Sequence, residues 1–437
     1  MRKSLIVLLA AGLVVAACSE AEPESSTPDP STDESTGESG PANSVVEGFA
    51  GEEWFMGIVP DEPVAADPSL EPIQIGMINQ EDTPLGSFPE LRRATEGTVE
   101  FINTELGGVG GRPIELTTCV VSFNVEQSQA CAQTMVQKDV VALSGGIDVV
   151  SDTGSIPVLE QNGIPQVGGI PANLAEQKSD VTFYFSGGVT GALAAFMADA
   201  AENDAEKVVI GYGEFNAFEE SAREYAVPVG ESLGMTVDLA PFNIAATDFL
   251  PILTGIADSD PDAIIMAVAG SSCVPLMETY ADLQIEAQLY LVGACAADEI
   301  VEAAGENVDG IVFNSEGPVE VGDTEGDIYN EINARYADGE GSGSGTLGVR
   351  SMMNLYALLD ELGPDGVSRE AVTGLIRQAV DRPSFWGYPY TCDGEQIAGL
   401  PSLCAPQQTL FTAVGPADFE QRGPAFIDTV ALFEAAL

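Results

Sequence analysis

The feature that most constrains the fold is the segment 140–171, which holds two apolar runs separated by small-residue turns. Its pattern predicts a buried strand, a short helix that starts near Ser151, and a second strand at 165–168. Together these form one βαβ unit of a parallel sheet. Ligands of open α/β sheets bind beyond the carboxyl ends of the strands. We therefore expect the turns 145–151 and 169–172 to form one wall of a binding cleft.

The rest of the chain continues the alternation of strands and helices. The portion 263–292 repeats the layout of the first unit, with a buried strand followed by a small-residue turn, a helix and a second strand. A chain of 437 residues is long enough for two domains. The pattern therefore predicts an α/β fold with two lobes, each a mostly parallel sheet flanked by helices. Near the end of the chain, two more strands are predicted at 385–391 and 409–414.

The N-terminus carries the features of an export signal. Arg2 and Lys3 precede an apolar run at 5–17, which is too short for an ordinary membrane span. The residues Val-Ala-Ala-Cys that end at Cys18 resemble the bacterial lipobox, whose cysteine is lipidated and becomes the first residue of the mature protein. This predicts a signal peptide at 1–17 and attachment to the outer face of the cell membrane through the lipid alone. The alternative is a plain signal peptide that is cleaved near Ala17.

Composition restricts the possible partners. Asp and Glu number 69 against 15 Lys and Arg, so the formal net charge is −54. Such a chain repels nucleic acid and anionic lipid, which excludes both as partners. The charge suits solubility or adaptation to salt, with attraction of a cationic ligand as the alternative. The stretch 19–43 has almost nothing to bury, and we expect 18–70 to be an acidic, disordered tether. Within it, the segment 45–59 carries aromatic residues and either packs on the folded body or belongs to the linker.

Cysteine usage agrees with export. Six cysteines remain beyond Cys18, an even number that suits an oxidising compartment. They fall into local pairs along the chain, although six cysteines allow 15 connectivities. A metal site is the competing interpretation, and composition argues against it because the chain has no histidine and no Cys-x-x-Cys pair. We predict three disulfides and no metal: Cys119–Cys131, Cys273–Cys295 and Cys392–Cys404.

The sequence offers little for catalysis. Without histidine, Ser-His and Cys-His pairs are impossible, and paired cysteines leave no thiolate. No phosphate-binding or dinucleotide-binding glycine motif follows any predicted strand, so no cofactor is expected. Carboxylates are too abundant for a catalytic pair to be picked out. An enzyme remains only a remote alternative.

Several segments resemble one known family when they are taken in order. They are the strand 73–78, the loop ending Gly-Ser-Phe-Pro at Pro89, the helix ending Glu-Phe-Ile-Asn, the segment 107–116 and the turn after 141–144. These are similar to the leucine/isoleucine/valine-binding proteins, which are substrate-binding proteins of ABC importers with the type I periplasmic-binding fold. The resemblance covers about 73–415. It implies two α/β lobes joined by three hinge crossings, with lobe 1 at 71–186 and 313–385, the main part of lobe 2 at 187–312, and a final crossing and lobe 2 segment at 386–437.

The resemblance also implies ligand-binding positions on the turns of both lobes. A ligand carboxylate is held in that family by a serine and by backbone groups of two turns, and an aromatic residue lies on the first loop. Carried over, lobe 2 contributes the turns 214–218, 269–272 and 294–297. The candidate ligand-binding residues are Phe88, Gly146, Asp148, Val149, Ser151, Gly169, Ile170, Ala172, Phe215, Phe218, Gly270, Ser271 and Ala296.

The departures from the family pattern concern the ligand's ammonium group. Cys295 stands where amino-acid binders of the family carry a carboxylate, and Ala269 stands where they carry a tyrosine. A buried ammonium without a counter-charge is costly. Either Asp148, Glu214 or Asp298 supplies that charge, or the ligand has no ammonium. Structural roles also stay open: the phenylalanines can pack between lobes, and the carboxylate and serines can cap helices.

The function that these patterns imply is capture of a small polar solute, such as a branched-chain or other amino acid or an amide-like compound. The expected partners are that ligand and a membrane permease of the ABC type, and the protein is expected to be a monomer. A ligand-sensing receptor or regulator with the same fold is the alternative.

Overall fold

The computed structural model describes residues 45–46, 57–317, 324–341, 343–416 and 418–437, without the side chains of Asn216 and Ala217. The predicted signal peptide, the lipidation site Cys18 and most of the predicted tether lie outside these residues. Within the described ranges, no helix has both the length and the apolar character needed to cross a membrane.

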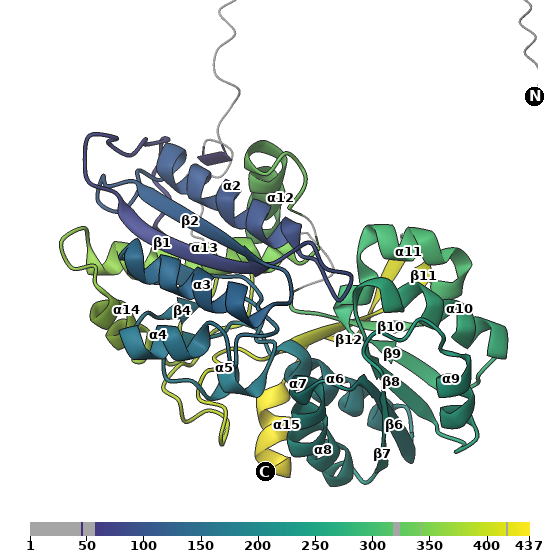
Figure 1. Ribbon diagram of the computed structural model, residues 1–437. Helices are drawn as coiled ribbons and strands as arrows, with labels where there is room; N and C mark the ends of the chain where they lie inside the picture. The colour runs from purple at the N-terminus through teal and green to yellow at the C-terminus, as the bar shows by residue number, and fades with distance from the viewer. Residues whose placement is uncertain (1–44, 47–56, 318–323, 342, 417) are drawn as a thin grey trace, which may run out of the picture. The chain divides into compact units, whose positions relative to one another are not determined.

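Lobe 1 is built on a five-stranded sheet in the order β2-β1-β3-β4-β5 (Figure 1). All four pairings are parallel, and β1 and β2 run in register from Ile73 with Ile114 to Gln80 with Val121. Strands β1, β3, β4 and β5 are largely buried, as expected for a parallel sheet covered on both faces, whereas the edge strand β2 is mostly partly buried. Their bounds are β1 (Ile73–Gln80), β2 (Ile114–Val121), β3 (Ala142–Ser144), β4 (Gln166–Val167) and β5 (Thr182–Phe183).

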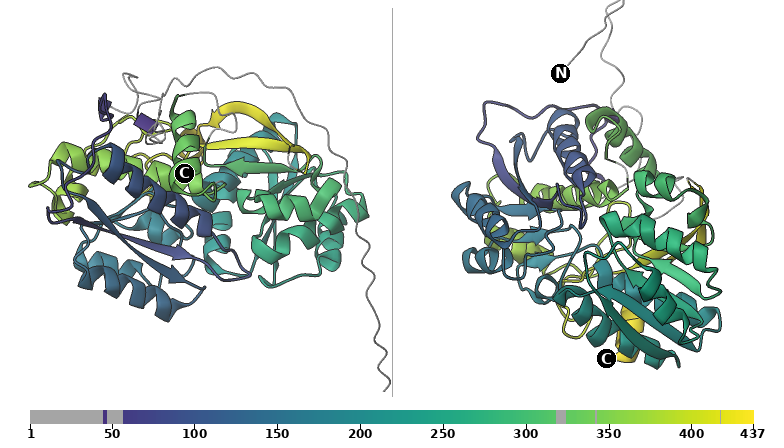
Figure 2. Two further views of the ribbon diagram at one scale, coloured as in Figure 1. Left: turned by 90° about the horizontal axis from the view of Figure 1, so that it is seen from above. Right: turned by 45° about the vertical axis from the view of Figure 1, so that its right-hand side comes forward.

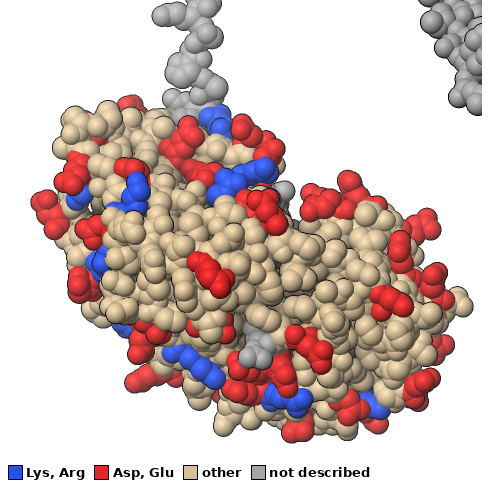
Figure 3. All heavy atoms as spheres, viewed as in Figure 1, with Lys and Arg blue, Asp and Glu red and all other residues tan. Residues whose placement is uncertain are grey.

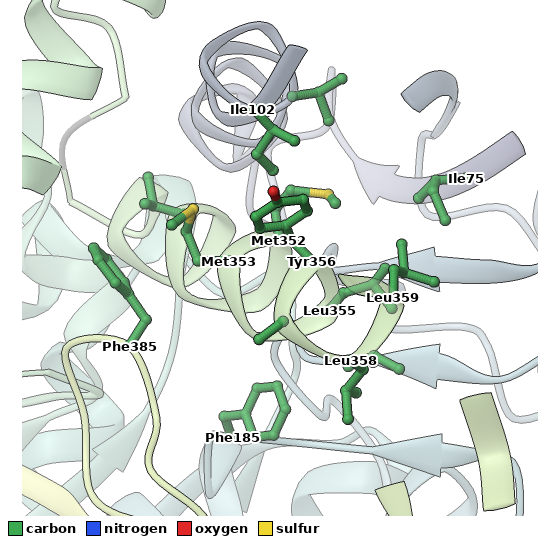
Figure 4. Close-up of a cluster of buried hydrophobic side chains, with 14 of the residues drawn as sticks. Ile75, Ile102, Phe185, Met352, Met353, Leu355, Tyr356, Leu358, Leu359 and Phe385 are labelled. Carbon is green, nitrogen blue, oxygen red and sulfur yellow. The ribbon is translucent and has the colours of Figure 1, made fainter. Parts of the chain in front are cut away.

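Helices from two distant parts of the chain cover this sheet. Those from the first part are α2 (Pro89–Glu105), α3 (Val125–Gln137), α4 (Ile156–Asn162) and α5 (Leu174–Lys178). Those from later in the chain are α12 (Thr324–Tyr336), α13 (Gly345–Leu362) and α14 (Arg369–Ile376), drawn in green on the same lobe in Figure 1. Figure 4 shows α13 at the centre of the lobe 1 core, where Met352, Leu355 and Leu359 lie among residues of α2, β1 and the segment after β5.

Lobe 2 is built on a seven-stranded sheet in the order β12-β11-β10-β9-β8-β6-β7. Strands β6 to β10 are parallel, whereas β11 and β12 are antiparallel to their neighbours and form the yellow hairpin along the lobe in Figure 2. The strand bounds are β6 (Lys207–Gly213), β7 (Thr236–Phe242), β8 (Ala263–Ala267), β9 (Gln288–Leu291), β10 (Val312–Ser315), β11 (Gln408–Gly415) and β12 (Asp418–Ile427).

The helices of lobe 2 connect and cover these strands. They are α6 (Gly188–Glu202), α7 (Asn216–Glu220), a π-helical segment η2 (Ser221–Ala226), α8 (Val227–Ser232), α9 (Leu250–Ala257), α10 (Cys273–Leu283), α11 (Asp298–Ala304) and α15 (Thr429–Ala436). Two short 3₁₀ turns, η3 (Gly270–Ser272) and η4 (Gly293–Ala296), follow β8 and β9, and a third, η5 (Gly305–Val308), follows α11. The two-lobed α/β architecture predicted from the sequence is confirmed.

The chain crosses between the lobes three times, after β5, after β10 and before β11. Glu316 is a half-buried residue just after β10 that contacts the other two crossings. Its Oε2 accepts hydrogen bonds from the backbone N–H of Gly187 at 3.2 Å and from Nε2 of Gln408 at 2.7 Å. Arg350 of α13 is buried beside it and donates to the backbone carbonyls of Phe185 and Trp386 as well as that of Glu316. Burial raises the pKa of Glu316 to about 7 and lowers that of Arg350 to about 10.

All three predicted disulfides are confirmed. Cys119–Cys131 joins β2 to α3 within lobe 1, and Cys273–Cys295 joins the start of α10 to η4 within lobe 2. Cys392–Cys404 closes a loop between α14 and β11.

Part of the segment before β1 packs on lobe 1. Val45 and Val46 are buried in the lobe 1 core, and their N–H groups donate to the carboxylate of Glu105 at 3.1 and 2.7 Å. The N–H of Val64 donates to the carbonyl of Glu105 at 2.9 Å. The stretch predicted as a tether, 18–70, therefore includes residues that contact the folded body.

Three local predictions differ from the structure. The helix expected near Ser151 begins at Ile156, because the intervening residues form turns that are closed by hydrogen bonds to Asp148 and Ser151. The strand predicted at 385–391 is wrong: the segment is a loop with one isolated bridge, between Arg382 and Tyr390. The hairpin partner β12 and the last helix α15 were not predicted.

Candidate functional site

The candidate site is formed by turns at the carboxyl ends of the two parallel sheets. In lobe 1 these turns follow β1, β3 and β4, and in lobe 2 they follow β6, β8 and β9. Because parallel strands of one sheet end at the same edge, each lobe presents its turns together. The predicted site residues all lie on or next to these turns, apart from Phe218, which lies in α7.

Gly146 and Gly169 allow the turns that follow β3 and β4 of lobe 1 to pack directly on each other. The N–H of Ile170 donates to the carbonyl of Gly146 at 2.9 Å. A Cβ atom on Gly169 would lie 2.4 Å from that same carbonyl oxygen, and one on Gly146 would lie 2.0 Å from the carbonyl oxygen of Ile78. Both glycines also have positive φ, at +92° and +94°. Only glycine fits at either position.

The backbone N–H groups of the 169–172 turn have partners within the protein. That of Gly169 donates to Oγ of Ser351 at 2.9 Å. That of Ala172 donates to Oε2 of Glu176 at 2.5 Å, and Pro171 has no N–H. In this conformation these amides therefore stabilise the turn itself. Sequence reasoning missed Ser351, which comes from a distant helix, but Glu176 was recognisable as the third helical residue of an Asn-x-x-Glu capping box.

Ser151 and Asp148 belong to a buried polar network behind these turns. Oδ2 of Asp148 accepts hydrogen bonds from the hydroxyls of Ser128 and Ser155. Ser151 Oγ accepts from Nδ2 of Asn173 at 2.6 Å. Both residues are buried, and burial raises the pKa of Asp148. The Asp148 carboxylate is thus already bound by local donors.

Glu176 is the most deeply buried acid of this network. Only 1% of the residue is exposed, and burial raises the pKa of its carboxyl to about 8. Hydrogen bonds from the hydroxyl of Ser151 and from the N–H groups of Ala172 and Asn173 lower this pKa, because they stabilise the charged carboxylate. The network therefore joins the two lobe 1 turns through a carboxyl group that titrates near neutral pH.

The surface in front of this network is apolar and includes a residue of lobe 2. Phe88 and Ala172 are buried in one cluster, on which Val149, Ile170 and Ala294 pack as partly buried neighbours. Four predicted site residues therefore come together: Phe88, Val149, Ile170 and Ala172. Ala294 of η4 joins them from lobe 2, whereas the predicted residue Ala296 packs on the lobe's own core.

Direct contacts join the lobes beside this cluster. The carbonyl of Pro84, in the loop after β1, accepts hydrogen bonds from the N–H and the hydroxyl of Ser271 at 3.1 and 3.2 Å. A Cβ atom on Gly270 would lie 2.3 Å from the same oxygen, so the close approach requires glycine. The predicted residues Gly270 and Ser271 thus contact lobe 1.

The two predicted phenylalanines of lobe 2 have different neighbours. The ring of Phe215 lies 5.6 Å from that of Phe123 in lobe 1, measured between centroids. Phe218 packs against the lobe 2 core and lies 6.2 Å from Phe215. Phe215 therefore bridges the lobes, and Phe218 supports it from behind.

Charge is not concentrated at this site. Glu214 and Asp298, the other proposed partners for an ammonium, are exposed to solvent. In the face shown in Figure 3, acidic side chains are scattered over both lobes. The described residues contain no cluster of acids and cysteines with the geometry of a metal site. Shape and apolar contact, rather than a fixed charge, characterise the candidate site.

Comparisons with known proteins agree with this architecture. No curated protein matches the chain. A leucine-binding protein from Thermotoga maritima has a similar structure, with 17% identity, a TM-score of 0.66, and coverage of 80% of this chain and 98% of that one. The substrate-binding protein of a branched-chain amino acid transporter from Streptococcus pneumoniae, in complex with isoleucine, shows 18% identity, a TM-score of 0.65, and coverage of 81% and 100%.

A third solved structure of the same fold has a different ligand. It is a solute-binding protein of an ABC transporter from R. palustris in complex with benzoate, with 17% identity, a TM-score of 0.67, and coverage of 82% of this chain and 97% of that one. The family model described as periplasmic binding protein matches residues 72–392. The chain therefore belongs to the periplasmic binding protein family, with the type I fold of the leucine-, isoleucine- and valine-binding proteins of ABC transporters.

Proposed function

We propose that this protein is the extracytoplasmic solute-binding lipoprotein of an ABC importer. It captures one small solute between its lobes, does not convert it, and delivers it to a membrane permease as a monomer tethered through lipid on Cys18. In this proposal two lobes move relative to each other: lobe 1 is 71–186 with 313–385, and lobe 2 is 187–312 with 386–437. Family membership supports the class of function.

The observation that carries the proposal is the apolar cluster shared by both lobes. Phe88, Ile170 and Ala294 come from three separate turns and two lobes, yet they lie in one cluster. A ligand that inserts between them replaces contacts that the lobes otherwise make with each other. Such a ligand stabilises the closed form by its own differential contacts.

The apolar residues of these turns favour a solute with a small apolar body, and the family resemblance adds a carboxylate. A branched aliphatic or aromatic group fits residues such as Val149 and Ile170, and the relatives described above bind isoleucine and benzoate. The carboxyl groups of Asp148 and Glu176 are bound within the protein, the first by Ser128 and Ser155 and the second by backbone N–H groups, so neither is turned toward an ammonium. Since an unpaired buried ammonium is costly, we expect acids without an amino group to bind at least as well as amino acids.

A thermal-shift screen followed by calorimetry tests this proposal. The panel is leucine, isoleucine, valine, 3-methylpentanoate (isoleucine without its amino group), benzoate and acetamide. One class should raise the melting temperature, because a ligand that binds only the folded state stabilises it. NMR of the solute after incubation should show it unchanged. Flat curves across the panel would remove the proposed ligand class, and consumption of a solute would favour an enzyme.

A further inference from the structure

The Cys273–Cys295 disulfide lies directly behind the two lobe 2 turns that meet lobe 1. Cys273 follows η3 as the first residue of α10, and Cys295 lies within η4. The bond holds their Cα atoms 5.4 Å apart, and both cysteines are fully buried. It therefore links two loops that belong to neighbouring strands, β8 and β9.

Each linked turn makes a different contact with lobe 1. Ser271, two residues before Cys273, donates twice to the carbonyl of Pro84. Ala294, immediately before Cys295, packs on the apolar cluster with Phe88 and Ile170. A covalent bond one or two residues from each contact fixes the spacing between them.

We propose that the Cys273–Cys295 disulfide is a positioning element for lobe closure. It keeps the polar contact at Ser271 and the apolar contact at Ala294 at the separation that the facing turns of lobe 1 require. The inference rests on the proposed function in one respect, namely that ligand binding depends on closure. The family resemblance implies a carboxylate at position 295 for an amino-acid ligand. This chain has a disulfide-bonded cysteine there, which fixes the position of the turn.

A comparison of two disulfide deletions tests the proposal. The test variant is C273A/C295A, and the matched control is C119A/C131A, whose disulfide also joins a strand region to a helix but lies within lobe 1. Chain-entropy arguments give both bonds a similar effect on overall stability, so both variants should lose a comparable amount of melting temperature. A purely structural role predicts no other difference between them.

The decisive measurement is hydrogen exchange at the amides of 82–88 in lobe 1. This loop contains Pro84 but no cysteine, and it follows the β1 residues that pair with β2 beside Cys119, so its exchange reports closure rather than loosening at either deleted disulfide. We expect exchange to rise at least tenfold in C273A/C295A and to stay at the wild-type rate in C119A/C131A. Wild-type exchange in the test variant, or an equal rise in both variants, would overturn the proposal. If the double alanine variant does not fold, C273A/C295V, which refills part of the lost volume, takes its place.

A ligand titration separates this inference from the proposed function. With isoleucine, 3-methylpentanoate and benzoate as probes, Kd should rise at least tenfold in C273A/C295A and should not change in the control. If no probe binds the wild-type protein, the proposed ligand class is wrong, and the exchange experiment still decides the role of the disulfide. Wild-type affinity in the test variant would contradict the positioning role.

Discussion

Arg350 and Glu316 lie side by side at the hinge, and Arg350 binds the backbone of Glu316 while the Glu316 carboxylate binds the other two chain crossings. Replacing Arg350 by leucine should destabilise the protein by about 3–5 kcal/mol, because it leaves three backbone carbonyls without their donor and removes the positive charge beside Glu316. Chemical denaturation measures this change. The control is R223L, which removes an exposed Arg–Glu pair between η2 and α7 and should leave stability nearly unchanged. Equal losses in both variants would show that the hinge arginine has no special role.

Gly169→Ala should disrupt the packing of the two lobe 1 turns. The added Cβ would lie 2.4 Å from the carbonyl oxygen of Gly146, and φ at position 169 is +92°. We expect a loss of more than about 2 kcal/mol in the free energy of unfolding. Gly163→Ala is the matched control, since its φ is +58° but nothing lies within 4 Å of the added atom. It should cost only about 1 kcal/mol, and a similar loss at both positions would contradict the close approach.

Glu176 should make stability fall as pH rises. Its pKa is about 8 in the folded protein and 4.5 as a model value, so between these values the folded state binds a proton more tightly than the unfolded state. The free energy of unfolding therefore decreases as pH rises from about 5 to 8. E176Q removes this titration and should flatten the profile by about 1.4 kcal/mol or more. Denaturant melts across that pH range measure the slope.

A substitution at an exposed acid serves as the control for this pH effect. E231Q changes a residue exposed on α8 and should leave the slope unaltered. Some slope should persist in E176Q, because burial also raises the pKa values of Asp148 and Glu316. A wild-type profile that is flat, or that rises with pH, would show that Glu176 stays ionised throughout.

Ile170→Ala should weaken ligand binding more than it weakens the fold. Ile170 is only half-buried and packs on the edge of the apolar cluster. Losing its contact with the apolar part of a ligand should reduce affinity about 10- to 30-fold, measured by calorimetry with whichever solute the screen identifies. Ile285→Ala, which shortens a partly buried residue packed on the lobe 2 core, should leave affinity unchanged. Unchanged affinity in the Ile170 variant would show that the ligand does not contact this cluster.

Local patterns in the sequence predicted the features that depend on nearby residues. The sequence pattern predicts a helix at 125–137, and α3 has these bounds because its apolar periodicity and the cap at Asn124 are both local. The disulfides followed from cysteines 12 to 22 residues apart. The turn glycines at 146 and 169 were also identified from their immediate context.

Features that depend on distant residues could not be predicted in the same way. Ser351 is 182 residues from the Gly169 amide that it accepts from, and Ser128 is 20 residues from Asp148. These partners form hydrogen bonds with the Gly169 amide and the Asp148 carboxylate. From the local sequence alone, both groups are expected to be free to bind a ligand. The strand predicted at 385–391 failed for a related reason: its apolar residues, such as Phe385 and Tyr390, are buried in the lobe 1 core from a loop.

The interleaving of the two lobes along the chain has a consequence for how the molecule is made. Helix α13, at the centre of lobe 1, is synthesised only after all five parallel strands of lobe 2, and lobe 2 in turn needs Phe433 of α15 for its core. Lobe 1 therefore cannot complete its core before α13 has been made, and lobe 2 cannot complete its own before α15 has been made. The nascent polypeptide stays incompletely packed until α15 emerges, a state that suits the export proposed above, because an unfolded chain can pass through a narrow channel.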